Sequence, residues 1–132
     1  MALNAGLHRL EKIRSDAESR RKRLLFWHIY SMDRALALNH GIAPNIPDYD
    51  IQTEKPSFPD DIDGHMGHIN MHWIDLSELQ GQIYVQLYSA QAERGPLEAK
   101  IDSARQLAIR CLEIQESLHA VRQRFHSYIR LF

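Results

Sequence analysis

The sequence predicts an all-α domain: a helical array of about three long helices plus a short N-terminal helix, with a long acidic, proline-rich loop. Apolar residues recur at helical spacing in three long segments. Four of the five prolines fall together between the first two of these segments, where Gly41 precedes them and Gly64 follows. The chain has 132 residues, of which 44% are hydrophobic and 25% charged, and this suits one globular domain.

The first forty residues are expected to hold two helices. Residues 2–10 have the pattern of a short helix, and the segment from Ser15 to His40 has that of a long one. Ser15 or Asp16 can cap the long helix, and Gly41 can end it.

This long helix carries apolar residues on every side. Leu25, Ile29, Met32 and Leu36 follow helical spacing. Further apolar residues lie on the other faces: Leu24, Phe26, Trp27, Tyr30, Ala35, Ala37 and Leu38. A helix that is apolar all round is normally buried on all sides. We therefore expect it to be the central helix of the domain.

The loop over residues 41–64 is acidic, and the segment before it is basic. Residues 1–40 hold eight Lys and Arg against four Asp and Glu, whereas residues 41–75 hold one against seven. Phosphates of a nucleic acid are one class of partner for the basic run Arg20–Arg23. The favoured interpretation is a solvated first turn of the helix, in which some of these side chains pair with carboxylates of the same chain. Asp16 and Glu18 are close in sequence, and the loop offers Asp48, Asp50, Asp60 and Asp61.

Two more helices are expected, over residues 65–93 and 96–126. Pro96 suits the first position of the latter. Gly81 lies inside the former at a cost of about 1 kcal/mol relative to alanine, which indicates that another helix passes close by. Cys111 lies on the apolar stripe of the last helix, so a buried and unreactive thiol is expected.

Asp33 and Arg34 are the candidate site at the centre of the first long helix. Charges within an apolar helix must be paired, because an unpaired buried charge costs several kcal/mol. We interpret them as a structural salt-bridge network within the domain, with both side chains mostly buried. A ligand-contacting or catalytic pair is the alternative. Since no neighbouring residues complete a catalytic set, we expect no enzyme activity.

Three histidines, His65, His68 and His72, share one helical face. Imidazole is a good zinc ligand, so a metal-binding helical protein is one hypothesis. An exposed helix start that bears histidines is the favoured interpretation, and we expect no metal site.

Cys111 is the only cysteine, which excludes an internal disulfide and a cysteine-based zinc cluster within the chain. It favours a reducing compartment, cytosol or nucleus. No apolar run approaches the length of a membrane span, and the first residues lack the features of a signal peptide.

The stretch from the basic run to the loop is similar to the signature of a known family. The matching residues are Arg21, Lys22, Arg23, Leu25, Phe26, Trp27, Tyr30, Asp33, Arg34, Leu36, Leu38, Gly41, Pro44, Ile46, Asp48, Tyr49, Asp50, Ile51 and Pro56. This pattern resembles the fungal-specific transcription factor domain, the middle homology region of fungal binuclear zinc-cluster transcription factors, over roughly residues 5–90. Leu24, Ile42 and Ala43 depart from it, since the family has an arginine at the first position and Arg-Pro at the other two.

The resemblance implies a regulatory domain that controls transcription in a longer, nuclear parent protein. It implies a homodimer or a co-regulator as protein partner, a small-molecule effector, and no membrane. Zinc and DNA would be bound by a six-cysteine cluster of the parent, and no cofactor is expected in this chain. We expect residues 1–132 to be a fragment that exposes apolar surface. A small helical interaction or adaptor domain without a role in transcription is the alternative.

Overall fold

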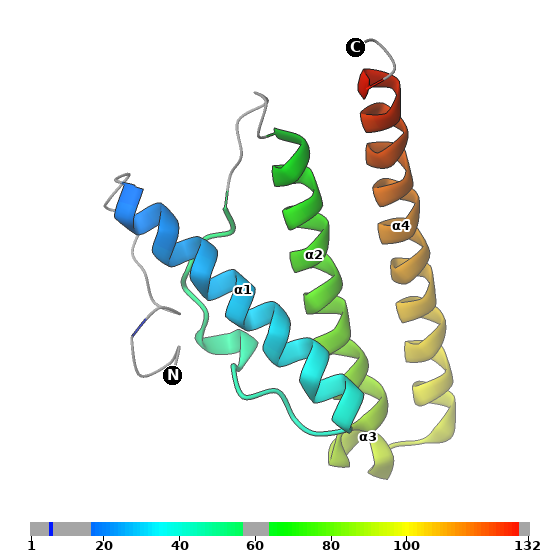
Figure 1. The fold of residues 1–132 in the computed structure, drawn as a ribbon. Helices are drawn as coiled ribbons and strands as arrows, with labels where there is room; N and C mark the ends of the chain where they lie inside the picture. Colours follow the sequence, from blue (N-terminus) through cyan, green and yellow to red (C-terminus); the bar gives the residue numbers. More distant parts are fainter. Residues whose placement is uncertain (1–5, 7–16, 57–63, 130–132) are drawn as a thin grey trace.

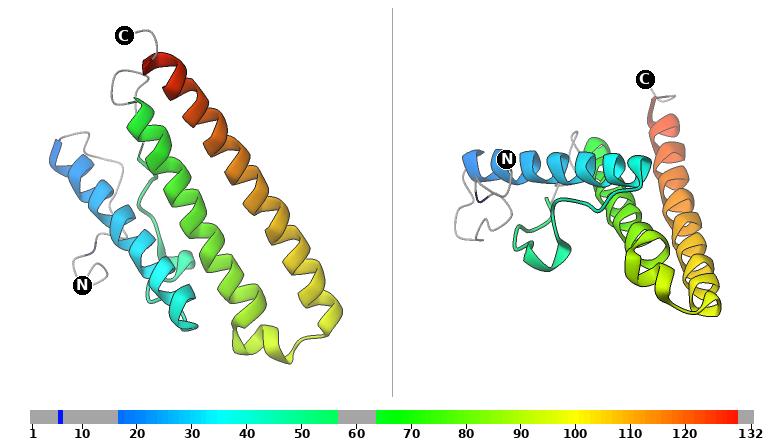
Figure 2. Two further views of the ribbon diagram at one scale, coloured as in Figure 1. Left: turned by 45° about the vertical axis from the view of Figure 1, so that its right-hand side comes forward. Right: turned by 90° about the horizontal axis from the view of Figure 1, so that it is seen from below.

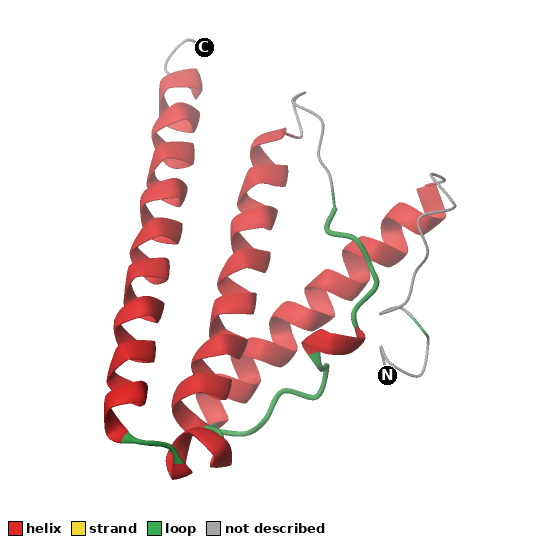
Figure 3. Cartoon of the chain, turned by 180° about the vertical axis from the view of Figure 1, so that it is seen from behind, coloured by secondary structure: helices red, strands yellow, loops and turns green. Residues whose placement is uncertain are grey.

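The computed structural model describes residue 6, residues 17–56 and residues 64–129, with side chains left out for residues 64–66, 68 and 124–129. The described segments form four α-helices: α1 (Ala17–His40), α2 (Gly64–Ile83), α3 (Ala90–Arg94) and α4 (Leu97–Ile129). A 3-10 turn, η2 (Asp48–Asp50), and a π-helical turn, η3 (Tyr84–Tyr88), complete them. The all-α prediction is confirmed, and these segments contain no strand (Figure 3). The short helix expected over residues 2–10 lies outside the described residues, apart from Gly6, which is in a turn.

Helix α2 lies between α1 and α4 (Figures 1 and 2). It packs against α1 on one side and against α4 on another. The central position expected for α1 is therefore wrong. Three of the four residues that the sequence suggested as its stripe are exposed on the outward face of α1, with Leu25 52%, Met32 64% and Leu36 53% exposed. The fourth, Ile29, is partly buried and packs against the core.

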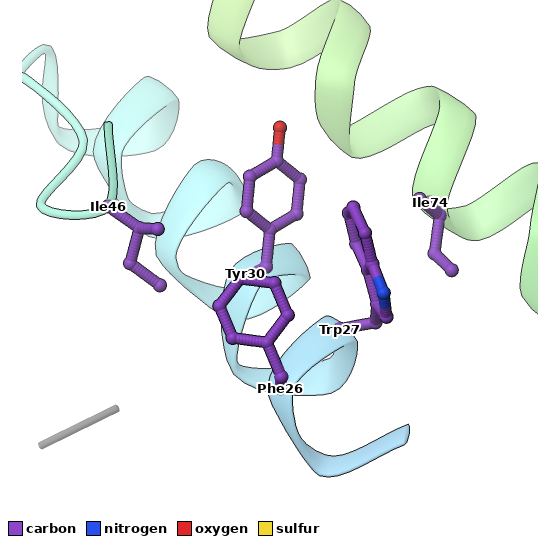
Figure 4. Packing of buried hydrophobic residues seen from close by; sticks show 5 residues of the cluster. All are labelled: Phe26, Trp27, Tyr30, Ile46 and Ile74. Atoms are coloured by element: carbon purple, nitrogen blue, oxygen red, sulfur yellow. The ribbon is translucent and has the colours of Figure 1, made fainter. Parts of the chain in front are cut away.

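The core forms around three aromatic residues of α1. Phe26, Trp27 and Tyr30 are buried against Ile46 of the following loop and Ile74 of α2 (Figure 4). The Trp27 ring meets those of Phe26 and Tyr30 in edge-to-face arrangements, with centroids 5.3 and 5.2 Å apart. This is a favoured geometry for aromatic pairs. The core thus joins α1, the loop and α2.

Gly41 ends α1, as expected. Its φ of 64° lies in the left-handed region, which glycine adopts without steric cost. The N–H of Ile42 donates to the carbonyl of Ala37 at 3.0 Å, and the N–H of Gly41 donates to that of Leu38 at 3.3 Å. This is the Schellman pattern of a helix C-terminus, and it turns the chain back along α1.

The helix expected over residues 65–93 is interrupted at Ser89. The backbone of Ser89 is extended, with φ −67° and ψ 154°. Its N–H donates to the carbonyl of Tyr84 at 2.9 Å, and its hydroxyl accepts from the N–H of Ala92 at 3.1 Å. Serine favours this N-cap position because its side chain satisfies a free backbone donor. Ser89 therefore ends the η3 turn and begins α3.

The long helix α4 contacts α2 through a face that contains Leu107, which is buried, and Ile114 and Val121, which are half-buried. Cys111 is exposed, so the prediction of a buried thiol is wrong. It lies four residues after Leu107, about 40° further round the helix, and α4 is covered only on the α2 side of the described structure. Within the described residues, no helix is long and apolar enough to cross a membrane.

Candidate functional site

The candidate site is a set of contacts between α1 and the loop that follows it, here called the clasp. It consists of Tyr30, Asp33 and Arg34 on α1, with Asn45, Ile46 and Asp48 on the loop. The three helix residues are spaced i, i+3 and i+4, so they share one face of α1. The Gly41 turn brings the loop back over this face.

Arg34 is the centre of the clasp and is only 3% exposed. Its Nη2 donates to the Ile46 carbonyl and to Asp48 Oδ1, both at 2.7 Å. Tyr30 donates its hydroxyl to the same Asp48 oxygen at 2.8 Å, and the guanidinium lies 4.5 Å from the centroid of the Tyr30 ring. The ion pair and the cation–π contact together stabilise a buried charge. The prediction of a buried, salt-bridged Arg34 is confirmed.

Asp33 behaves differently from the prediction. It is half-buried, and no ion pair to it is found among the described residues. Its Oδ1 accepts from the backbone N–H of Asn45 at 3.1 Å and from the Asn45 side-chain amide at 2.9 Å. Its Oδ2 accepts from the N–H of Ile46 at 3.1 Å. Asp33 therefore orders the backbone of the loop and does not pair with a cation.

Trp27 holds the far end of the same loop. Its Nε1 donates to the carbonyl of Glu54 at 2.8 Å, while its ring is buried in the core. A buried indole N–H normally finds such an acceptor. The loop is thus attached to α1 at its start by Asp33, in its middle by Arg34, and near residue 54 by Trp27.

The remaining predicted site residues are less involved. No ion pair joins the basic run to the described part of the loop. Asp60 and Asp61 of the loop lie outside the described residues, so the pairing of Arg21 and Arg23 with the loop stays a prediction. Lys22 instead pairs with Glu18 one turn earlier, at 2.6 Å. Asp48 of the loop pairs with Arg34, which lies further along α1 than the basic run. Three other residues of the motif shape the turn: Gly41, the half-buried Pro44, and Asp50 in η2.

Lys55 forms a second attachment that sequence reasoning missed. Its ammonium group donates to Glu78 at 2.8 Å and to Asp75 at 3.2 Å on α2. Burial alone would lower the pKa of Lys55, but the hydrogen bonds to Glu78 and Asp75 and the attraction of their negative charges together outweigh it and raise the pKa. The only sequence signal was a single lysine in an acidic segment. Lys55 thus fixes the end of the described loop to α2.

A cleft of about 470 Å³ opens beside the clasp, between the loop and α2. Its lining combines apolar and charged side chains: Trp27, Asp48, Ile51, Thr53, Lys55, Glu78 and Gln82. Its volume lies within the usual range for small-molecule sites, about 300–1,000 Å³.

Of the three histidines considered as zinc ligands, only the side chain of His72 is described. It hydrogen-bonds to Ser117 of α4 at 2.7 Å. The described side chains include no group of three residues that could hold a metal ion.

Gly81 of α2 makes room for Arg34, in agreement with the close approach expected at this position. A Cβ at Gly81 would lie 3.2 Å from both Cδ and Nε of Arg34. Gly81→Ala is expected to destabilise by about 1 kcal/mol, because crowding a pinned side chain outweighs the higher helix propensity of alanine. In an Arg34→Ala background, Gly81→Ala is expected to stabilise by up to about 1 kcal/mol.

Urea denaturation of the wild type, both single variants and the double variant measures this coupling. A stabilising effect of Gly81→Ala in both backgrounds would show that Arg34 does not fill this space.

Tyr30 gives the clasp a dependence on alkaline pH. Burial, and then the hydrogen bond to Asp48, raise the pKa of Tyr30 well above its usual range. The unfolded chain releases this proton near pH 10, while the folded protein keeps it. The unfolded state is therefore favoured as the pH rises above about 10, and the free energy of unfolding falls.

We expect this alkaline fall to be smaller in Tyr30→Phe, which has no proton to release. Urea denaturation of both proteins from pH 8 upward measures the two slopes, and Lys55 contributes to both alike. Parallel slopes would contradict the assignment, whatever the difference in stability at pH 8.

The structure defines the class of the protein. It is an all-α domain in which an aromatic and charged motif joins α1 to the loop that follows it. The model of the fungal specific transcription factor domain matches residues 1–94, and the chain belongs to this family. The match spans α1, the clasp, α2 and α3, and it ends before α4. This is a family of transcription factor domains and not of enzymes. Comparisons with curated proteins and with solved structures found no match.

Proposed function

We propose that this chain is a regulatory part of a fungal zinc-cluster transcription factor and controls transcription in a full-length parent. The observation that carries the proposal is the family match over residues 1–94, which includes every residue of the clasp. The protein acts in the nucleus, where transcription takes place, and has no catalytic role. DNA and zinc are bound by a separate six-cysteine cluster of the parent, because this chain has one cysteine.

In this proposal, the domain works by holding or releasing protein partners, such as a co-regulator, or by responding to a small-molecule effector. The cleft beside the clasp supports the second route. A ligand there would contact Asp48 and Lys55, which attach the loop to α1 and to α2 respectively. Binding would therefore act on the position of the loop relative to the two helices.

The test places the full 132-residue chain between a heterologous DNA-binding domain and an activation domain in a fungal reporter strain. We expect reporter output to differ severalfold from that of a fusion with a flexible linker of equal length. Trp27→Ala is the control, because disruption of the core should abolish the difference at equal protein level. Equal output from the chain and linker fusions would contradict the proposal and favour an adaptor domain without a role in transcription.

A further inference from the structure

The outward face of α4 carries large apolar residues at its centre. Leu107, Ile114 and Val121 mark the face that packs on α2. Ile109 and Leu112 follow Leu107 by two and five residues, which places them about 160° and 140° round the helix axis from it. They are 57% and 58% exposed. Their exposure on the side opposite α2 indicates a surface available to another molecule.

The charges on this face form a pattern that is complementary to itself. Ile109 and Leu112 are equally distant from the point between Arg110 and Cys111. Arg105 and Glu116 are also equally distant from this point, each about 8 Å along the axis. Asp102 and His119 repeat the symmetry further out. All four of these polar side chains are exposed, and Arg105 is 3.4 Å from Asp102 of its own chain.

This symmetry indicates that the partner is a second copy of α4 and that the two helices run antiparallel. In a two-fold interface, the same patch contacts itself, so residue i meets j and j meets i. An antiparallel second copy of α4 places Ile109 against Leu112, and Arg105 against Glu116, twice each. A parallel copy would place each arginine beside its equivalent, and like charges repel.

We propose that the chain forms an antiparallel homodimer through the outward face of α4, centred between Arg110 and Cys111. The interface consists of Ile109 and Leu112 at the centre and two Arg105–Glu116 ion pairs at the flanks. The family match ends at residue 94, so this surface lies in the part of the chain that the match does not cover. The dimer does not depend on the proposed role in transcription. One helix pair is a small interface, so the dimer dissociates at micromolar concentration.

Sedimentation of the full 132-residue chain over micromolar to submillimolar concentrations tests the dimer. Arg105→Glu and Glu116→Arg should each raise the dissociation constant at least tenfold, equivalent to about 1.4 kcal/mol. The variant with both changes should recover to within about threefold of the wild type. An equimolar mixture of the two single variants should also dimerise, because the two altered side chains then face each other with opposite charges, and so do the two unaltered ones.

Arg94→Glu is the matched control, a charge reversal at an exposed residue of α3 that should leave the dissociation constant unchanged. Far-UV circular dichroism confirms that each variant remains helical. A monomer at every concentration would overturn the proposal. A dimer whose dissociation constant is unchanged by the single charge reversals would also overturn it, since association would then use another face. A mixture of the two single variants that stays monomeric would overturn it as well.

Discussion

Replacing Trp27 with alanine is expected to lower the free energy of unfolding by about 3–5 kcal/mol, the range for deleting a large buried aromatic side chain. Trp27 is only 5% exposed and contacts the rings of Phe26 and Tyr30. The substitution leaves a cavity between α1 and α2, and it removes the donor that binds the Glu54 carbonyl. Urea denaturation followed by far-UV circular dichroism measures the loss without relying on tryptophan fluorescence.

The chain has its own matched control in Trp73, the second tryptophan. Trp73 lies on α2 and is 61% exposed, so Trp73→Ala should change stability by much less, about 0.5 kcal/mol. Trp27→Phe should fall between the two, because it keeps most of the buried ring and loses the hydrogen bond to Glu54. Equal losses for Trp27→Ala and Trp73→Ala would contradict the position of Trp27 in the core.

The burial of Trp27 and Arg34 could be predicted from sequence, but the orientation of their helix could not. The stripe through Leu25, Met32 and Leu36 is wholly apolar and was the natural choice for a buried face. The face that is buried includes Ser31 and Arg34. Because polar residues occupy core positions, the spacing of apolar residues does not identify the buried face of the helix. Apolar residues on every side of the helix also give no reason to prefer one face over another.

The sequence predicted that Arg34 pairs with a carboxylate, but not which carboxylate it is. The cost of a buried charge required a partner for Arg34, and the acidic loop was the obvious source of one. Which carboxylate reaches Arg34 depends on the path of the loop. That path is determined by contacts of Asp33 with the Asn45 and Ile46 backbone and by burial of Ile46. Hydrogen bonds to backbone N–H groups and the burial of one isoleucine leave little trace in composition or charge counts.

Arg34→Met is expected to lower the free energy of unfolding by about 3 kcal/mol, the lower end for breaking a buried ion pair. The methionine fills part of the volume but leaves the Ile46 carbonyl without its donor. Asp48 also loses its cation, although water can reach this half-exposed carboxylate, and this keeps the loss at the lower end. Arg34→Lys should recover only part of it, because an ammonium group lacks the planar shape that lies over the Tyr30 ring.

Lys22→Met is the matched control for this prediction, because it removes a cation from an exposed ion pair on the same helix. Lys22 and Glu18 are 48% and 74% exposed, and such pairs contribute about 0.5 kcal/mol or less. Urea denaturation at neutral pH should therefore separate Arg34→Met from Lys22→Met by more than about 2 kcal/mol, given these two estimates. If the two variants unfold at the same urea concentration, the buried Arg34–Asp48 contact does not stabilise the domain.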